Sequence, residues 1–206
     1  MRSTAQIAPP RTKLSTLPFE QRRGVQAVWL LAATESMLFI CFFGAYYYLG
    51  NNENRWAQHQ APDLWVPFTN LGIVLAGGVA LWLGGRALKS GNQLPARLAI
   101  WFTALCGIFF LCLEGYEYTF SWMVEAPYND AYGSIFYTIN FMDDAHVVAG
   151  VLILAFVGSL PQIGATEKTP HFAFQTVAWY WYFVIGLWFI IVMLLYVVPV
   201  LQRLHS

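Results

Sequence analysis

The chain has 206 residues, of which hydrophobic types make up 58 %, aromatic types 17 % and charged types only 11 %. Soluble domains carry about 25 % charged residues, so this composition excludes an ordinary soluble protein and indicates an integral membrane protein. Basic and acidic residues, 11 of each, cancel to a net charge of zero. This balance by itself says nothing about partners, and we expect no nucleic-acid partner.

Five apolar stretches are long enough to cross a bilayer, because a helix that rises about 1.5 Å per residue needs roughly 20 residues to span the hydrocarbon core. The sequence therefore predicts an all-α membrane protein with five transmembrane helices. Residues 1–24 form a predicted cytoplasmic N-terminal tail, which lacks the apolar core of a signal peptide, and residues 25–206 form the transmembrane domain. The predicted spans are 28–49, 66–88, 98–122, 134–160 and 177–200.

The basic residues are distributed unevenly over the connecting segments. Nine of the 11 fall on one side of the predicted bilayer, and Arg55 and Arg203 fall on the other. Because cytoplasmic segments carry the excess of Lys and Arg, we expect the N-terminus in the cytoplasm and the C-terminus outside. The nine are Arg2, Arg11, Lys13, Arg22, Arg23, Arg86, Lys89, Arg97 and Lys168.

Carboxylic acids inside the predicted spans are the most informative feature of the chain. An ionised side chain at the bilayer centre costs roughly 2.5–3.5 kcal/mol on insertion scales. Each such acid therefore needs a partner, a proton or a water-filled pocket. They are Glu35, Glu114, Glu117, Asp143 and Asp144.

The residues inside the spans are a poor match to known metal and haem sites. His146 is the one histidine in a predicted span, and it cannot provide both axial ligands of a bis-histidine haem. Asp143-x-x-His146 and Glu114-x-x-Glu117 resemble half of a di-iron carboxylate site, but such sites use two histidines. We expect a hydrogen-bonded polar cluster and no metal, with a membrane carboxylate-bridged di-metal enzyme as an alternative.

Glu114 and Asp143 are expected to lie at similar depth on neighbouring antiparallel helices. Glu114 is 13 residues before Pro127 and Asp143 is 16 residues after it, so their depths differ by only about 4 to 5 Å. Two like charges repel strongly at low dielectric, and we expect the two carboxyls to share a proton or to bracket His146. Glu35 is either a neutral carboxyl bonded to a neighbouring helix, or a protonatable group that exchanges with the cytoplasm or binds a lipid head group.

Longer motifs follow one another along the chain in a fixed order. They are Trp29 through Glu35 to Tyr46, Pro67-x-x-Asn70, Gly107 through Glu117-Tyr118, Tyr132-Gly133-Ser134-x-Phe136-Tyr137, and His146-Val147. The most specific tract is His171-Phe172-x-Phe174-x-x-x-Ala178-Trp179-Tyr180-Trp181-x-Phe183-Val184-x-x-x-Trp188. From about residue 24 to residue 198 the chain resembles subunit III of the haem–copper respiratory oxidases (the cytochrome c oxidase and quinol oxidase subunit 3 family), in its five-helix bacterial form.

The resemblance implies a non-catalytic, lipid-binding subunit of a proton-pumping terminal oxidase, which reduces oxygen to water in aerobic respiration. Such a subunit has no catalytic residue or cofactor of its own; haem and copper are expected in subunits I and II. It packs on subunit I and other oxidase subunits, binds phospholipid, and supports proton uptake and sustained turnover. The implied location is the bacterial inner (cytoplasmic) membrane, with a respiratory supercomplex as a further setting. The accessory subunit of a bacterial nitric oxide reductase is a second alternative.

The resemblance also assigns residues that are linked to lipid or protons. Glu35 and Glu117 fall on intramembrane glutamates of the family, and His146 falls on the second His of its His-Gly-x-His-Val motif. Arg86 and His171 lie near the predicted inner interface, where basic side chains can bind anionic head groups. We expect these five residues to serve lipid binding or proton exchange.

Other residues depart from the family pattern. Asp143 stands where the first His of the motif is expected, Asp144 stands where Gly is expected, and Glu114 replaces a usual Gln. We expect these three acids to form a polar cluster peculiar to this chain. Tyr182 and Ile185 replace a His and an Asp in the last span, so handling of lipid or protons identical to that of the relatives is not implied.

Overall fold

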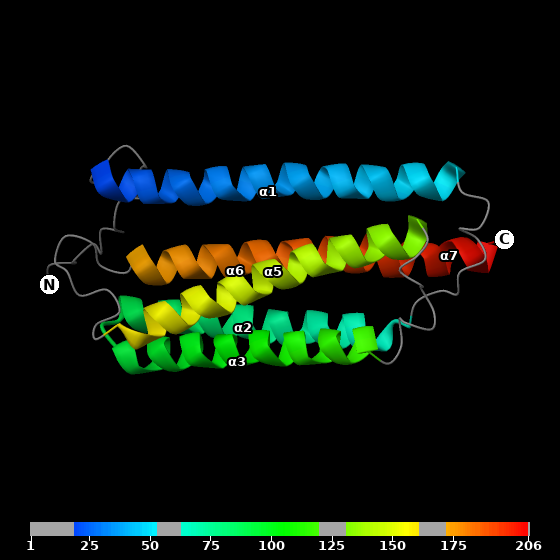
Figure 1. The fold of residues 1–206 in the computed structure, drawn as a ribbon. Helices are drawn as coiled ribbons and strands as arrows, with labels where there is room; N and C mark the ends of the chain where they lie inside the picture. The colour runs from blue at the N-terminus through cyan, green and yellow to red at the C-terminus, as the bar shows by residue number, and fades with distance from the viewer. Residues whose placement is uncertain (1–18, 53–62, 120–130, 161–171, 206) are drawn as a thin grey trace, which may run out of the picture.

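The computed structural model describes residues 19–52, 63–119, 131–160 and 172–205. They form a bundle of five long helices, each long and apolar enough to span a membrane, so the predicted all-α class with five candidate spans is confirmed (Figure 1). The helices are α1 (Phe19–Asn52), α2 (Trp65–Lys89), α3 (Gln93–Glu117), α5 (Ala131–Ser159) and α6 (Phe172–Ile191), which continues as a π-helical turn η4 (Val192–Val197) and α7 (Val198–His205).

The helix ends differ from the predicted spans by several residues. α1 begins at Phe19, inside the predicted tail, and α3 runs from Gln93 to Glu117 instead of over 98–122. The early start of α3 follows from a tight turn after α2, in which Gly91 adopts a φ of 83°. Glycine adopts this left-handed conformation at no steric cost. The start of the apolar run does not mark the start of the helix, because polar residues can form the first turn of a helix.

The wide turn η4 has a cause in the sequence. It ends two residues before Pro199, which lies in the first turn of α7. A proline inside a helix has no N–H to donate, and its ring clashes with the carbonyl four residues earlier, here that of Leu195. A π-helical turn accommodates this break without ending the helix.

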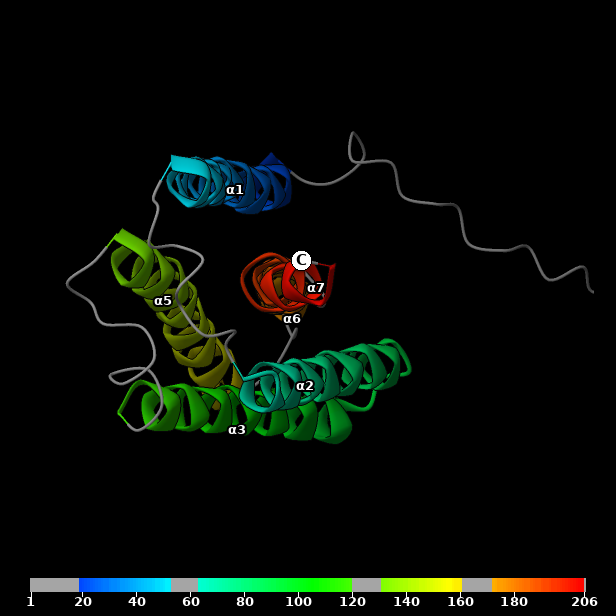
Figure 2. The ribbon, with the colours of Figure 1, turned by 90° about the vertical axis from the view of Figure 1, so that its right-hand side faces the viewer.

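Trp181 of α6 lies at the centre of the bundle. Figure 2 shows α6 between α1, α5 and α2, with α3 beyond α2. The Trp181 side chain is fully buried, and its Nε1 donates a hydrogen bond of 3.2 Å to the Val74 carbonyl. Gly77 on α2, Gly107 on α3 and Gly150 on α5 make room for the ring, since a Cβ on each would lie 3.1, 3.0 and 3.4 Å from it.

Helix α1 packs more loosely than the other four. Only 6 % of its most apolar window is buried, against 39–44 % in the other spans. It packs mainly on α5 and α6 and stands apart from the α2–α3 pair (Figures 1 and 2). Its position places Glu35 at the boundary between a separate helix and the body of the bundle.

Candidate functional site

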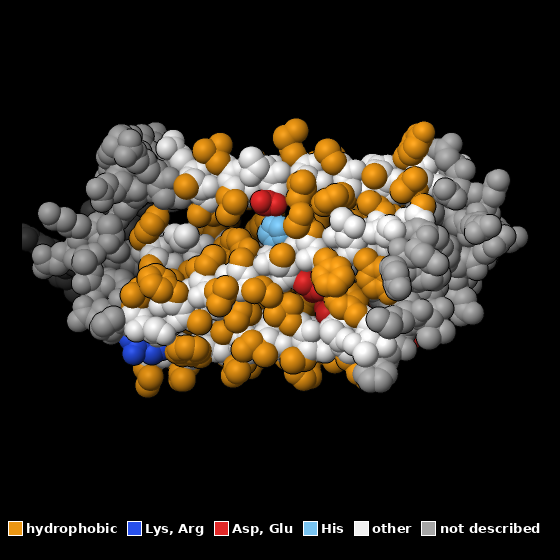
Figure 3. Space-filling view, in the orientation of Figure 1, with side chains coloured by type: hydrophobic (Ala, Val, Ile, Leu, Met, Phe, Trp, Pro, Cys, Tyr) orange, Lys and Arg blue, Asp and Glu red, His pale blue; other side chains and the backbone are white. Residues whose placement is uncertain are grey.

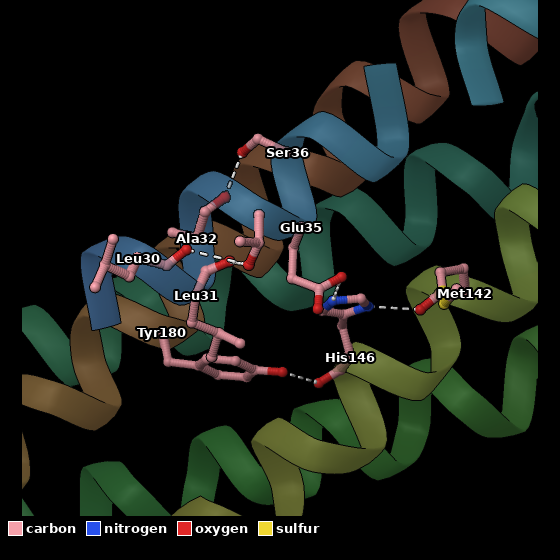
Figure 4. Close-up of polar contacts among 9 residues, drawn as sticks. Leu30, Leu31, Ala32, Glu35, Ser36, Met142, His146 and Tyr180 are labelled. Atoms are coloured by element: carbon pink, nitrogen blue, oxygen red, sulfur yellow. Dashed lines mark hydrogen bonds and ion pairs between the residues drawn. The ribbon is translucent and has the colours of Figure 1, made fainter. Parts of the chain in front are cut away.

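Glu35, the most exposed of the five intramembrane acids, pairs with His146, the one histidine buried within the described part of the bundle. His146 Nε2 lies 3.3 Å from Glu35 Oε2, and the two side chains are 10 % and 29 % exposed. His146 Nδ1 lies 2.6 Å from the carbonyl oxygen of Met142, one turn earlier on α5. Figure 4 shows the carboxyl of α1 and the imidazole of α5 facing each other.

The two contacts of the imidazole determine how the pair holds a proton. A carbonyl oxygen can only accept a hydrogen bond, so we assign a hydrogen to Nδ1, which donates to Met142. A further proton between Nε2 and the Glu35 carboxyl would make the pair neutral overall, either as a neutral acid facing a neutral ring or as a carboxylate facing an imidazolium. Both forms have the same net charge. The pair can therefore hold a proton at bilayer depth without burying an uncompensated charge.

Aromatic side chains surround the Glu35–His146 pair. The rings of Phe39 and Phe183 have centroids 5.6 and 6.2 Å from that of His146, and the Tyr180 hydroxyl donates a 3.0 Å hydrogen bond to the His146 carbonyl. Figure 3 shows the histidine and an acidic side chain next to each other on a face that is otherwise largely hydrophobic. The pair is thus a polar site within an apolar surface.

An apolar groove lies between α1 and α6 and has a volume of about 280 Å³. Trp29 and Leu31 line it from α1, and Trp179 and Phe183 line it from α6. The Trp29 and Trp179 rings approach each other, with centroids 5.8 Å apart. The turns of α1 that precede Glu35, together with Phe183, whose ring packs near His146, therefore border a space suited to an apolar chain.

The other four acids are buried deeper, at 9 % exposure or less. Glu114 Oε1 accepts a hydrogen bond of 2.6 Å from Asn70 Nδ2, which joins α3 to α2. Asp144 Oδ2 accepts one of 2.6 Å from the Tyr118 hydroxyl. Asp143 is fully buried, and neither of its oxygens has a hydrogen-bond partner.

This arrangement differs from the predicted cluster around His146. The acid that meets the imidazole is Glu35, whereas Glu114 faces Asn70. The sharing of a proton between Glu114 and Asp143 stays a prediction. The sequence reasoning did not identify Asn70 and Tyr118 as partners of the acids. Both occur in the motifs quoted above. The available signal was a polar residue in or next to an apolar span.

The remaining predicted site residues have different surroundings. Arg86 is exposed in the last turn of α2, and its guanidinium lies 4.9 Å from the Trp82 ring centroid. His171 lies outside the described residues. Within the described ranges, no three His, Cys, Asp or Glu side chains come together to hold a metal ion, so the di-metal alternative has no ligand set in this part of the chain.

Comparison with known proteins gives the family. A family model described as Cytochrome c oxidase subunit III matches residues 18–199. Relatives named cytochrome c oxidase subunit 3 include those of Anopheles gambiae, 30 % identical over 180 residues, Drosophila melanogaster, 29 % over 178, and Ovis aries, 30 % over 180. Each alignment covers 81 % of this chain and 66 % of the relative.

The chain thus spans just under two thirds of the length of these curated relatives. The matched region nevertheless contains all of α1, α2, α3, α5 and α6, together with both members of the Glu35–His146 pair. With its five long helices, the chain belongs to the cytochrome c oxidase subunit III family, in its five-helix form.

Proposed function

We propose that this chain is the non-catalytic, lipid-binding subunit III of a proton-pumping haem–copper terminal oxidase, which reduces oxygen to water in aerobic respiration. The family match over residues 18–199 carries the proposal. In this role the chain packs on subunit I and other oxidase subunits, and subunits I and II hold the haem and copper. The relatives are named as subunits of cytochrome c oxidase, which favours an oxidase over a nitric oxide reductase.

The proposed setting is the bacterial inner membrane, with the N-terminus in the cytoplasm. The described basic residues support this orientation. Arg86 and Lys89 lie in the last turn of α2, and Arg97 follows in the first turns of α3. All three gather at the end of the bundle where α2 turns into α3, and an excess of basic residues is typical of a cytoplasmic face.

The groove between α1 and α6 is the proposed lipid site. Its volume of about 280 Å³ and its lining of Trp29, Leu31 and Phe183 suit a stretch of acyl chain. Gln175 and Thr176 provide polar groups in the same groove, next to Trp179, and tryptophans are enriched where acyl chains meet head groups. An acyl chain in this groove would fill the space that the loose packing of α1 leaves.

The proton-linked part of the proposal rests on the Glu35–His146 pair. The Glu35 side chain is partly accessible, at 29 % exposure. In this proposal the pair holds one transferable proton between Nε2 and the carboxyl. We propose that this proton is exchanged during turnover, and that the exchange supports proton uptake by the complex and keeps it active over many cycles.

Preparing the complex with and without this chain tests the proposed role. We expect equal haem and copper content and equal initial oxygen consumption in both preparations, but a faster loss of activity during turnover in the preparation without the chain. Loss of haem on removal of the chain, or identical activity over the whole time course, would contradict the proposal. Faster turnover of nitric oxide than of oxygen would favour the nitric oxide reductase alternative.

A further inference from the structure

The buried acids lie in a region where acceptor oxygens outnumber hydrogen-bond donors. Asn70 is fully buried, and Glu114 and Asp144 are 1 % and 9 % exposed. Five side-chain oxygens of these residues and of Asp143 are buried without a hydrogen-bond partner. They are Asn70 Oδ1, Glu114 Oε2, Asp143 Oδ1, Asp143 Oδ2 and Asp144 Oδ1.

The donors that reach the three acids are already used. Asn70 Nδ2 donates to Glu114, and the Tyr118 hydroxyl donates to Asp144. Among the described residues no Lys or Arg forms an ion pair with Glu114, Asp143 or Asp144. A buried polar atom without a partner costs several kcal/mol in an apolar medium, so five such oxygens require donors from another source.

Only two kinds of donor fit the chemistry of the site. A proton on a carboxyl converts one of its oxygens into an O–H donor, and a water molecule brings two donors and needs two to four polar partners. The described side chains do not form a metal-binding group. Three carboxyl protons convert three of the five oxygens into donors and leave two acceptors, and water can link the groups that do not meet one another directly.

We propose that Asp143, Asp144 and Glu114 form, together with Asn70, a buried site that binds protons and water, and that Asp143 exchanges protons with the Glu35–His146 pair. The site is built from this chain alone and stands independently of the oxidase assignment. We call it the interior acid site.

The position of Asp143 connects the interior acid site to the pair. Asp143 and His146 are three residues apart on α5, which places them on adjacent parts of one helix face. Tyr180 bonds the His146 carbonyl, and its hydroxyl lies within electrostatic range of both Asp143 and Glu35. A water molecule next to Asp143 is the proposed link between the two groups of acids.

The charge environment of the site is made of weak acids and one histidine. Glu114 lies within electrostatic range of Asp144, Glu117 and Asp143. The titratable groups around the site are Glu114 and Glu117 from α3, Tyr118 just after α3, Asp144 and His146 from α5, Tyr180 from α6, Tyr196 from η4 and Glu35 from α1. With no Lys or Arg among these groups, bound protons are the means of keeping the acids neutral.

Infrared spectroscopy of the purified protein at neutral pH tests proton binding directly. A protonated carboxyl has a C=O stretching band that an ionised carboxylate lacks, and the band shifts in D₂O. We use the Glu35→Gln background so that the pair does not contribute. Asp143→Asn should reduce the band, whereas Asp63→Asn should not, because the Asp63 side chain is exposed and accepts a hydrogen bond from the Trp65 backbone N–H.

Glu114→Gln is the second variant, in case Asp143→Asn does not fold. Glutamine keeps an oxygen that can accept from Asn70, so the contact between α2 and α3 is retained. It should also reduce the band. A folded variant with an unchanged band, or a wild-type band that disappears on adding Na⁺ at constant pH, would overturn the assignment of bound protons.

The exchange step has its own test. After transfer to D₂O, the interior carboxyl band should shift severalfold more slowly in Glu35→Gln than in the wild type, because the route through the pair is interrupted. The control Met37→Leu, at an exposed position of α1, should exchange at the wild-type rate. Equal rates in Glu35→Gln and the wild type would contradict exchange through the pair.

Discussion

The Tyr180 hydroxyl donates a hydrogen bond of 3.0 Å to the backbone carbonyl of His146. Tyr180 belongs to the aromatic tract of α6, and His146 meets Glu35 of α1 through its ring. Helices α1, α5 and α6 are therefore joined at one residue. Figure 4 shows Tyr180 and Glu35 reaching His146 from different sides. Helix α1 thus contacts the imidazole, and α6 contacts the backbone of the same residue.

Glu35→Gln should leave the haem content of the complex intact but change proton uptake or activity during sustained turnover. The amide keeps the size of the side chain and can still bond His146, but it cannot release a proton. Oxygen consumption and proton uptake, followed over many turnovers, measure the effect. Met37→Leu on the exposed face of α1 serves as the control. Unchanged uptake and turnover would leave Glu35 with a packing role alone.

Tyr180→Phe should weaken the attachment of α5 to α6 by about 1 kcal/mol, the usual net value of one hydrogen bond. Tyr182→Phe is a matched control, because the Tyr182 hydroxyl makes a longer contact of 3.4 Å with the Gly78 carbonyl. Thermal unfolding in detergent compares the two. A larger loss of stability in Tyr182→Phe than in Tyr180→Phe would contradict the importance of the His146 contact.

Gly107→Ala should destabilise the bundle by about 1–3 kcal/mol, the usual cost of overpacking a core. A Cβ at this position would lie 2.5 Å from a Val151 methyl and 3.0 Å from the Trp181 ring. Gly115→Ala on the same helix meets nothing within 4 Å, and it should stabilise the helix by up to about 1 kcal/mol. Denaturant unfolding distinguishes these opposite signs. Equal effects would show that the packing around Trp181 is not tight.

Ala32→Phe should reduce the phospholipid that co-purifies with the complex, because Ala32 lines the groove between α1 and α6 and a larger ring would occupy part of its volume. Ala33→Phe places the same ring on an exposed position of the same helix and should have no such effect. Phosphorus analysis of the washed complex gives the lipid content. The same lipid content in both variants would show that the groove is not a lipid site.

The five helices could be predicted from the sequence because the bilayer imposes a minimum length on each apolar run. Helix ends were less predictable. The turn at Gly91 and the polar start of α3 at Gln93 depend on backbone geometry and not on hydrophobicity. The motif tract with Trp181 was sufficient to predict the family, which the match over residues 18–199 confirms.

The partners of the acids could be predicted only in part. Depth along a helix follows from residue counts, but the rotation of one helix against another does not. The Glu35–His146 contact joins α1 to α5, which are separated by two other long helices in the chain. No short loop constrains their relative position. Similarly, the contact of Glu114 with Asn70 depends on how α3 is rotated against α2.

The central claim is that this chain is subunit III of a haem–copper oxidase, and the composition of the complex tests it most directly. The full chain, tagged and purified from its native membrane in mild detergent, should carry a stoichiometric subunit I with the absorption spectrum of haem and with bound copper. Recovery of the chain without any haem-bearing partner, or with stoichiometric metal bound to the chain alone, would contradict it.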